Sequence, residues 1–269
     1  MLGSVPALRV MSCNVRQPDL DDGANCWERR KDLLIEVIQG SRPDLVGAQE
    51  LFTIQADCIV GRAPQYSWFG TGRFGDARDK HVGIFYRRDL LRPLTTGDFW
   101  LSETPEIPGS SSWDIIRPRQ ATWGLFETPW GLRFHMLNTH FPYRKAEEGA
   151  RRQTATLLLR RIGALDANLP VILTADFNAD AGGEIYQMLS PVLRDAWTAA
   201  HRRTGPEATF NGFGKAAGRR RVDWILFRGP WTVREAETVT RSRDGVYPSD
   251  HYPILAEFET SGCAHQVGS

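Results

Sequence analysis

Acids, amides and histidines stand at the ends of several apolar segments in this 269-residue chain. Asp176 and Asn178 lie two residues apart directly after the run Val171–Ala175, and His251 shortly precedes another apolar run. Asp223 interrupts an apolar strand, and a buried acid needs a partner. A histidine suits this need, because a carboxylate bonded to one ring nitrogen directs the other nitrogen toward substrate. We therefore expect Asp223 and His251 to form a pair.

Oxygen-bearing side chains also end two predicted strands near the N-terminus. Asn14 closes the first strand and Glu50 follows the second. Carboxylate and amide oxygens without a Cys/His cluster favour Mg²⁺ or Mn²⁺ over zinc. The four cysteines include no C-x-x-C pair, which argues against a zinc knuckle or a disulfide scaffold. We interpret them as reduced thiols, mostly in the core.

The elements that must position these residues are mainly short strands. We expect strands at Leu8–Asn14, Asp44–Gln49, Val82–Tyr86, Phe99–Leu101, Thr122–Glu127, Leu132–Asn138, Val171–Ala175, Val222–Phe227 and Ile254–Phe258. Helical spacing marks Trp27–Gln39, which stops at Gly40, and a longer helix from Lys145 to Asp166. This pattern predicts a four-layer α/β sandwich of two packed, mostly antiparallel sheets flanked by helices.

Composition places the chain among ordinary globular proteins, with 41% hydrophobic and 24% charged residues. No internal repeat or linker divides it, so residues 1–269 are expected to form one domain, the last eight or so residues (about 262–269) being a loose tail. No apolar run approaches the roughly 20 residues of a membrane span. The N-terminus lacks the features of a signal peptide, which predicts a cytoplasmic location.

The charges nearly cancel: 33 basic and 32 acidic residues leave a net charge of +1. A protein with so little net charge has no positive electrostatic field that would bind a long nucleic-acid duplex by counterion release. A small phosphorylated molecule or a short nucleic acid is the better-fitting partner. The oligomeric state stays open.

Six short motifs occur in the order typical of one family. They are Asn14, Gln49–Glu50, Asn138–His140, Asp176–Asn178, Arg221–Asp223 and Ser249–His251. Over nearly its whole length the chain thereby resembles the endonuclease/exonuclease/phosphatase superfamily, which has a DNase I-like fold. Phe99–Pro105, Pro118–Arg119 and Thr209–Phe213 resemble its compact bacterial branch. The superfamily includes nucleases, deadenylases, sphingomyelinases and inositol-polyphosphate phosphatases, so the fold alone does not name the substrate.

The resemblance implies a metal-dependent phosphoric ester hydrolase with defined roles for its residues. Glu50 and Asn14 would hold Mg²⁺ (or Mn²⁺), with Asp250 near it, so that the metal neutralises a phosphate oxygen and the departing alkoxide. Asp176 would orient or deprotonate the attacking water, and Asn178 would place that water. The number of metal ions stays open.

Further residues would bind the phosphate. His251, held by Asp223, would donate to the phosphate oxygens or move a proton, and His140 would bind the phosphate from another side. Arg119 follows a proline, and its planar guanidinium matches two phosphate oxygens, although a surface ion pair is the alternative. Phe210 would wall the site or simply anchor its loop.

Lys80 departs from the pattern, because the family commonly has a glutamate there. Three outcomes are open. Lys80 contacts a phosphate oxygen, Asp79 replaces the missing acid after a one-residue shift, or the site is weakened.

Two alternatives compete with a phosphodiesterase or phosphatase of small substrates. A DNA or RNA nuclease would need a basic groove, with Arg119 and 219–221 on the same face as the acids. A catalytically silent phosphate-binding module is favoured by Lys80 but opposed by the retained Glu50, Asp176 and His251. Monoester or diester preference is not decided by the sequence.

Overall fold

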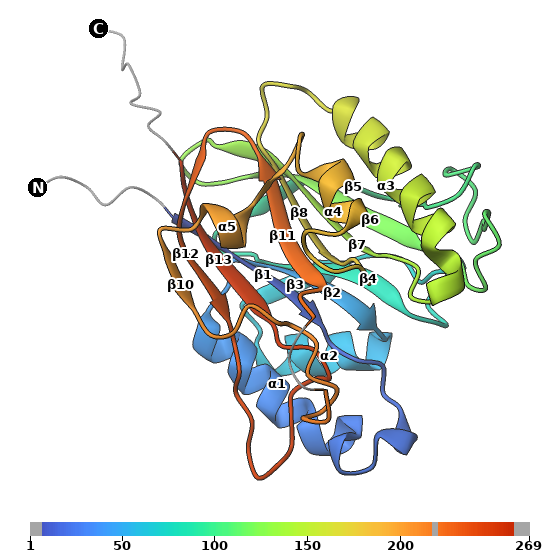
Figure 1. The fold of residues 1–269 in the computed structure, drawn as a ribbon. Helices are drawn as coiled ribbons and strands as arrows, with labels where there is room; N and C mark the ends of the chain where they lie inside the picture. Colours follow the sequence, from blue (N-terminus) through green and yellow to red (C-terminus); the bar gives the residue numbers. More distant parts are fainter. Residues whose placement is uncertain (1–6, 217–219, 261–269) are drawn as a thin grey trace, which may run out of the picture.

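Two mixed β-sheets pack face to face in the computed structural model, which describes residues 7–216 and 220–260 (Figure 1). The first sheet has the order β10-β12-β13-β1-β2-β4-β3. Its strands are β1 (Ala7–Asn14), β2 (Leu45–Leu51), β3 (Tyr66–Phe69), β4 (His81–Arg87), β10 (Arg202–Thr204), β12 (Trp231–Thr238) and β13 (Ile254–Thr260). The second has the order β5-β6-β7-β8-β11-β9. Its strands are β5 (Arg92–Trp100), β6 (Gln120–Glu127), β7 (Arg133–His140), β8 (Val171–Asp176), β9 (Arg194–Asp195) and β11 (Asp223–Arg228).

Helices cover the outer faces of both sheets. Apolar clusters pack α1 (Trp27–Ser41) and α2 (Thr53–Arg62) against the first sheet, and α3 (Glu148–Gly163) and α4 (Glu184–Leu189) against the second. Shorter helical pieces are η1 (Leu20–Asn25), η2 (Lys145–Glu147) and α5 (Ala196–Ala199). A third cluster fills the space between the sheets. The predicted four-layer α/β sandwich is confirmed.

Most neighbouring strands run antiparallel, as the sequence predicts. Within the described residues, only the pairs β1·β2, β7·β8 and β10·β12 are parallel. The first two of these pairs matter for the site, because parallel neighbours deliver the residues that follow them to the same edge of a sheet. No helix in the described segments has the length and apolarity needed to cross a membrane.

All nine predicted strands are present, but four others were missed. β12 reads poorly from sequence because a bulge between Val233 and Glu235 breaks its alternation. β5 begins seven residues before the expected Phe99. The prediction missed this first part because most of its residues are polar and solvent-accessible and form no apolar run. β3, β9 and β10 are only two to four residues long. The helices α2, α4 and α5 were not predicted either.

Both predicted helices have different ends in the structure. The first continues through Gly40 to Ser41 and stops where Arg42, which precedes a proline, adopts a left-handed φ of 46°. The second is shorter than expected: Lys145–Glu147 is a separate 3₁₀ turn, and α3 ends at Gly163. There the Arg228 guanidinium donates to the carbonyls of Ile162 and Asp166, at 3.3 Å each.

The cysteine interpretation was partly wrong. The three described cysteines are free thiols, as predicted. Cys13 is buried in β1, and the partly buried Cys58 packs against the apolar cluster of the first sheet, but Cys26, the N-cap residue of α1, is only partly buried. Cys263 and the expected loose tail lie outside the described residues.

A buried polar network joins the two sheets directly beneath the strand ends. Gln49 Nε2 donates to Asn138 Oδ1 at 2.7 Å, and Asn138 Nδ2 donates to the carbonyls of Ala48 and Gly83 at 2.9 Å. Thr174 Oγ1 completes the network by donating to Asn138 Oδ1 at 3.0 Å. Every side-chain polar atom of Asn138 is thereby hydrogen-bonded, and buried networks of this kind make a core rigid.

Gly47 is required by the close approach of the sheets at this network. A Cβ at Gly47 would lie 1.9 Å from Thr174 Oγ1 and 2.7 Å from Asn138 Oδ1. We expect Gly47→Ala to lower the free energy of unfolding by about 1–3 kcal/mol, because overpacking displaces the network. Urea unfolding measures this change. Gly61→Ala is the control, since a Cβ there meets nothing within 4 Å and α2 gains a better helix former. Equal stability of the two variants would contradict the prediction.

Candidate active site

Strand register alone brings three of the predicted site residues together. In the β7·β8 pair His140 lies opposite Asp176, and in the β8·β11 pair Asp176 lies opposite Asp223. All three side chains are buried at the ends of their strands. Asp176, on the middle strand, therefore stands between a histidine and a second acid.

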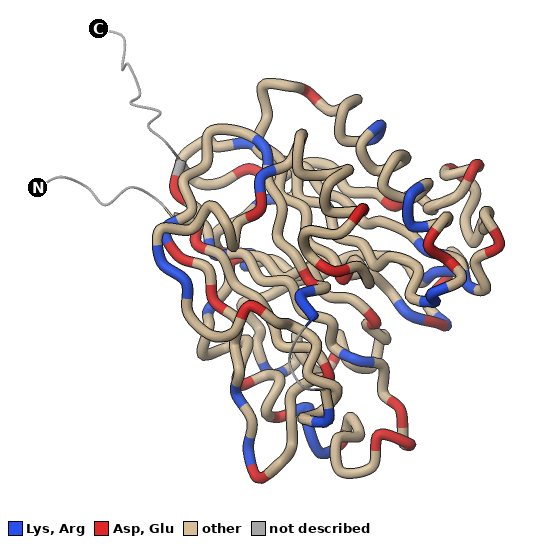
Figure 2. Tube along the Cα trace, in the orientation of Figure 1, with Lys and Arg blue, Asp and Glu red and all other residues tan. Residues whose placement is uncertain are grey.

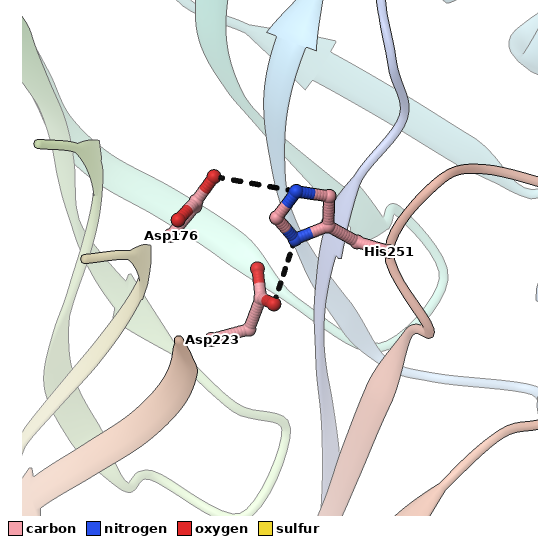
Figure 3. Close-up of side chains that lie close together, drawn as sticks. All are labelled: Asp176, Asp223 and His251. Atoms are coloured by element: carbon pink, nitrogen blue, oxygen red, sulfur yellow. Dashed lines mark hydrogen bonds and ion pairs between the residues drawn. The ribbon is translucent and has the colours of Figure 1, made fainter. Parts of the chain in front are cut away.

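His251 reaches this cluster from the segment before β13. Its Nδ1 lies 2.8 Å from Asp223 Oδ2, and its Nε2 lies 3.8 Å from Asp176 Oδ2 (Figure 3). The ring of Phe210 packs edge-on against the imidazole, with 5.1 Å between centroids. The structure thus forms the expected Asp223–His251 pair, and it places Phe210 as a support for the histidine.

The two histidines have opposite electrostatic environments. Burial lowers the pKa of His251, but the charges of Asp223, Asp176 and Asp250 outweigh burial and raise that pKa well above its ordinary value. Burial lowers the pKa of His140 well below its ordinary value, and the nearby Arg119 and Lys80 add to the effect. These directions favour the protonated form of His251 and the neutral form of His140.

Asp176 is held by three groups from three parts of the chain. Its Oδ2 accepts from Asn14 Nδ2 at 3.0 Å and lies 3.3 Å from His140 Nε2. Its Oδ1 accepts from the backbone N–H of Asn178 at 2.9 Å. Burial raises the pKa of Asp176 above its ordinary value, which is the direction that turns a carboxylate into an effective proton acceptor near neutral pH.

A bulge in β2 turns the Glu50 carboxylate into the cleft. The register with β4 shifts between Ala48 and Leu51, and Glu50 itself has a φ of 59°. Bulges next to functional sites re-aim a side chain in this way. Glu50 Oε2 then accepts from the Gln17 backbone at 3.2 Å and from Lys80 Nζ at 2.9 Å.

Lys80 therefore pairs with the acid of the site. Burial raises the pKa of Glu50, but the Lys80 ammonium and the Gln17 N–H outweigh burial and lower that pKa to about 2. Asp79 lines the same cleft, and its carboxylate lies 3.3 Å from Arg73 Nε.

The donor atoms around Glu50 suit a hard divalent cation. Glu50 Oε1 has no partner among the described residues, and Asn14 Oδ1, which accepts from Arg16 N at 2.9 Å, keeps a second lone pair. Asp250 lies in the same region, its Oδ2 3.8 Å from an Arg16 guanidinium nitrogen. These oxygen ligands fit Mg²⁺ or Mn²⁺.

A second group of potential ligands is less suitable. Asp176, Asp223 and His251 offer atoms within 4.8 Å of one another. However, these atoms already have partners: His251 Nδ1 lies 2.8 Å from Asp223 Oδ2, and Asp176 accepts from Asn14 Nδ2 and from the Asn178 N–H. Glu50 Oε1 has no such partner in the described chain, so the Glu50 side is the more suitable place for a hard cation.

Basic side chains also line the cleft, which has a volume of about 470 Å³. Arg119 is only 7% exposed, and its guanidinium stacks over the Tyr143 ring at 5.8 Å without a hydrogen bond or ion pair in the described chain. Burial and the neighbouring Arg73 lower the pKa of Arg119 to about 10. The expected alternative, a surface ion pair, does not apply.

The second basic segment predicted for a nuclease groove lies elsewhere. Arg221 is buried against Asp195 at 2.7 Å and Glu207 at 3.2 Å, and Arg220 pairs with Asp180. Residue 219 lies outside the described residues. Figure 2 shows basic residues interspersed with acidic ones along the trace. The described part of this segment therefore does not line the cleft with Arg119.

Arg30 was missed by the sequence reasoning. It is fully buried on α1 and donates to the carbonyls of Val15 at 2.7 Å, Arg16 at 2.6 Å, Gln17 at 3.1 Å and Pro248 at 2.9 Å. It thereby ties the segment after Asn14 to the segment before His251. Its place on the buried stripe of α1, three residues after Trp27, was the available signal.

We expect Arg30→Met to lower the free energy of unfolding by at least about 3 kcal/mol, because each buried carbonyl left without a donor costs about 1–3 kcal/mol. Chemical unfolding followed by fluorescence measures this loss. Arg29→Met is the control, since Arg29 is exposed on the same helix. A loss no larger than the control's would show that the four carbonyl bonds are dispensable.

Three solved structures are similar to this chain over nearly the whole length of both proteins. An endonuclease/exonuclease/phosphatase from Bacteroides vulgatus is 31% identical with a TM-score of 0.90, covering 95% of this chain and 99% of its own. A family protein from Bacteroides thetaiotaomicron is 32% identical with a TM-score of 0.88, covering 96% and 100%. A mannosyl-6-phosphatase from Bacteroides thetaiotaomicron is 31% identical with a TM-score of 0.85, covering 93% and 99%. Among curated proteins, none matches significantly.

The fold and its structural relatives define the class as a DNase I-like α/β sandwich of the kind that hydrolyses phosphoesters. The Endonuclease/Exonuclease/phosphatase family model matches residues 11–251. The chain belongs to this family. Its members are phosphoester hydrolases and generally depend on a divalent metal.

Proposed function

We propose that the protein is a divalent-metal-dependent phosphatase that hydrolyses monoesters of small phosphorylated molecules. The observation that carries the proposal is the buried Arg119 guanidinium, which has no anionic partner among the described residues and lines the same cleft as His251 and Asp176. A buried cation without a partner is costly, and a phosphate dianion would relieve that cost.

Asp176 is the proposed proton acceptor for the attacking water. Asn14 and the Asn178 backbone hold its two oxygens, so the carboxylate is oriented before substrate binds. The Asn178 side chain also lines the cleft, where its amide oxygen is available to place the water. The water forms a new bond to phosphorus, gives its proton to Asp176, and the leaving oxygen departs on the opposite side and takes a proton from solvent.

His251 is the proposed donor to the phosphate oxygens. Asp223 fixes Nδ1, so Nε2–H of the imidazolium faces the cleft and stabilises the charge that develops there. His140 remains neutral and binds the phosphate from its own side. Arg119 and Lys80 bind further oxygens, and the guanidinium fork of Arg119 suits two of them.

Glu50, Asn14 and Asp250 are the proposed holders of the metal. A divalent cation bound there supplies charge that neutralises a phosphate oxygen and the leaving oxygen. Glu50 Oε1 is the ligand atom most available to it, because Oε2 is shared by Gln17 and Lys80.

The cleft supports a small monoester more than a polymer. Its lining includes five Arg and Lys side chains, Arg16, Arg73, Lys80, Arg117 and Arg119, and only three acids, Glu50, Asp79 and Asp176. A monoester presents two charges to such a surface and a diester presents one. The mannosyl-6-phosphatase, 31% identical to this chain, acts on a compact substrate of this kind, according to its name.

Hydrolysis of p-nitrophenyl phosphate and of bis(p-nitrophenyl) phosphate tests the reaction class. We expect Mg²⁺-dependent turnover, with the monoester preferred, and complete loss of turnover on chelation. His251→Ala should lower kcat by roughly 10²–10³, the usual effect of losing one preorganised donor. His201→Ala is the control, because His201 is exposed at the surface. Turnover that survives chelation, or equal rates in the two variants, would refute this mechanism.

Arg119→Met tests the monoester preference directly. Hydrogen bonds to charged groups are worth about 1.5–3 kcal/mol, so kcat/KM for the monoester should fall by roughly 10- to 100-fold. The diester, with one charge fewer, should lose less. Arg152→Met removes an exposed guanidinium from α3 and serves as the control. A uniform loss for both esters would argue that Arg119 does not select the monoester.

A further inference from the structure

The ion pair between Lys80 and Glu50 lies at the position proposed for the metal. Lys80 Nζ is 2.9 Å from Glu50 Oε2, and the two side chains are only 19% and 13% exposed. An exposed pair of this kind has little energetic weight, but partial burial removes much of the solvent screening. The ammonium is therefore a strong competitor for any cation that approaches the same carboxylate.

The surrounding charges direct Lys80 toward Glu50. Arg73 and Arg119 line the same cleft and repel the ammonium. Asp79, the other acid nearby, pairs with Arg73 Nε at 3.3 Å. In the described chain, Glu50 is consequently the one acid within ion-pair distance of Lys80 Nζ.

A phosphate in the cleft would change this balance. Lys80 lines the cleft together with Arg119 and His140, so its ammonium has an anion to bind as soon as substrate enters. The flexible lysine stem lets the charged end move between neighbouring acceptors. Movement to the phosphate would free Glu50 Oε2 for a cation.

We propose that Lys80 couples metal binding to substrate binding: its ammonium competes with the divalent cation for Glu50 and is handed over to the phosphate when substrate arrives. This inference rests on the proposed function, in which Glu50 is a metal ligand. Without an anion the protein holds its metal weakly. By linkage, an anion that draws Lys80 away tightens metal binding, and the metal tightens anion binding by the same factor.

Mn²⁺ binding, followed by the electron paramagnetic resonance signal of the free ion, tests the coupling without any turnover. The variants are Lys80→Met, which keeps the chain length without the charge, and Lys80→Gln, which keeps a donor for Glu50. Glu50→Gln removes the proposed ligand. Lys145→Met removes an exposed lysine outside the cleft as the charge-matched control. Thermal unfolding of each variant confirms that it is folded.

We expect Lys80→Met to bind Mn²⁺ about tenfold more tightly than the wild type, within the usual range of coupling between sites. Lys145→Met should bind as the wild type does. Sulfate, used as a non-hydrolysable dianion, should tighten Mn²⁺ binding to the wild type and have a clearly smaller effect in Lys80→Met. Lys80→Gln should show the same tighter Mn²⁺ binding and the same smaller sulfate effect. It therefore keeps the test valid if Lys80→Met does not fold.

The outcomes separate this inference from the proposed function. Loss of Mn²⁺ binding in Glu50→Gln, together with unchanged affinity in both Lys80 variants, would overturn the coupling and leave the metal site intact. Equal sulfate effects in wild type and the Lys80 variants would also overturn it. Wild-type affinity in Glu50→Gln would refute both the metal role of Glu50 and the coupling.

Discussion

The hydrogen bond from Asn14 to Asp176 is the interaction on which the rest of the site depends. It spans the two sheets at 3.0 Å, from the end of β1 to the end of β8. Beneath it, Gln49 on β2 and Asn138 on β7 join the two sheets through a buried hydrogen-bond network. The sandwich is therefore held most rigidly where its strand ends present the acids and histidines, and this rigidity keeps the site preorganised.

Such a concentration of polar groups is costly to fold. Arg16, Glu50 and Asn178 all have left-handed backbone, with φ of 52°, 59° and 49°, and each costs of order 1 kcal/mol or more. The apolar clusters between and outside the sheets offset this cost. Backbone strain and buried charge are concentrated at the site, because catalysis requires fixed side-chain orientations there. The remaining parts of the strands pack as in an ordinary core.

The charged residues of the cleft differ in whether an opposite charge lies beside them. Asp223 and His251 form a compensated pair, in which the Asp223 carboxylate favours the protonated imidazole and raises its pKa. Arg119 has no such compensation, and Lys80 has Glu50 as its one close acid in the described chain. The Asp223–His251 pair keeps the catalytic histidine in place, and Arg119 and Lys80 attract the anion. The negative charge of the substrate would thereby neutralise the cations of the cleft, and the positive charge of the metal would neutralise Glu50.

The sequence by itself determined the strands with continuous apolar runs and the order of the polar residues at their ends, because both are local patterns. It also indicated the Asp223–His251 pair, since a buried acid needs a partner. Only the tertiary structure decided that Lys80 contacts Glu50, that Arg119 is buried without an ion pair in the described chain, and that Arg30 ties two distant segments together. These facts depend on which strands become neighbours, and on a bulge in β2 that no periodicity reveals. A long charged side chain has many possible partners in the sequence, and packing selects one of them.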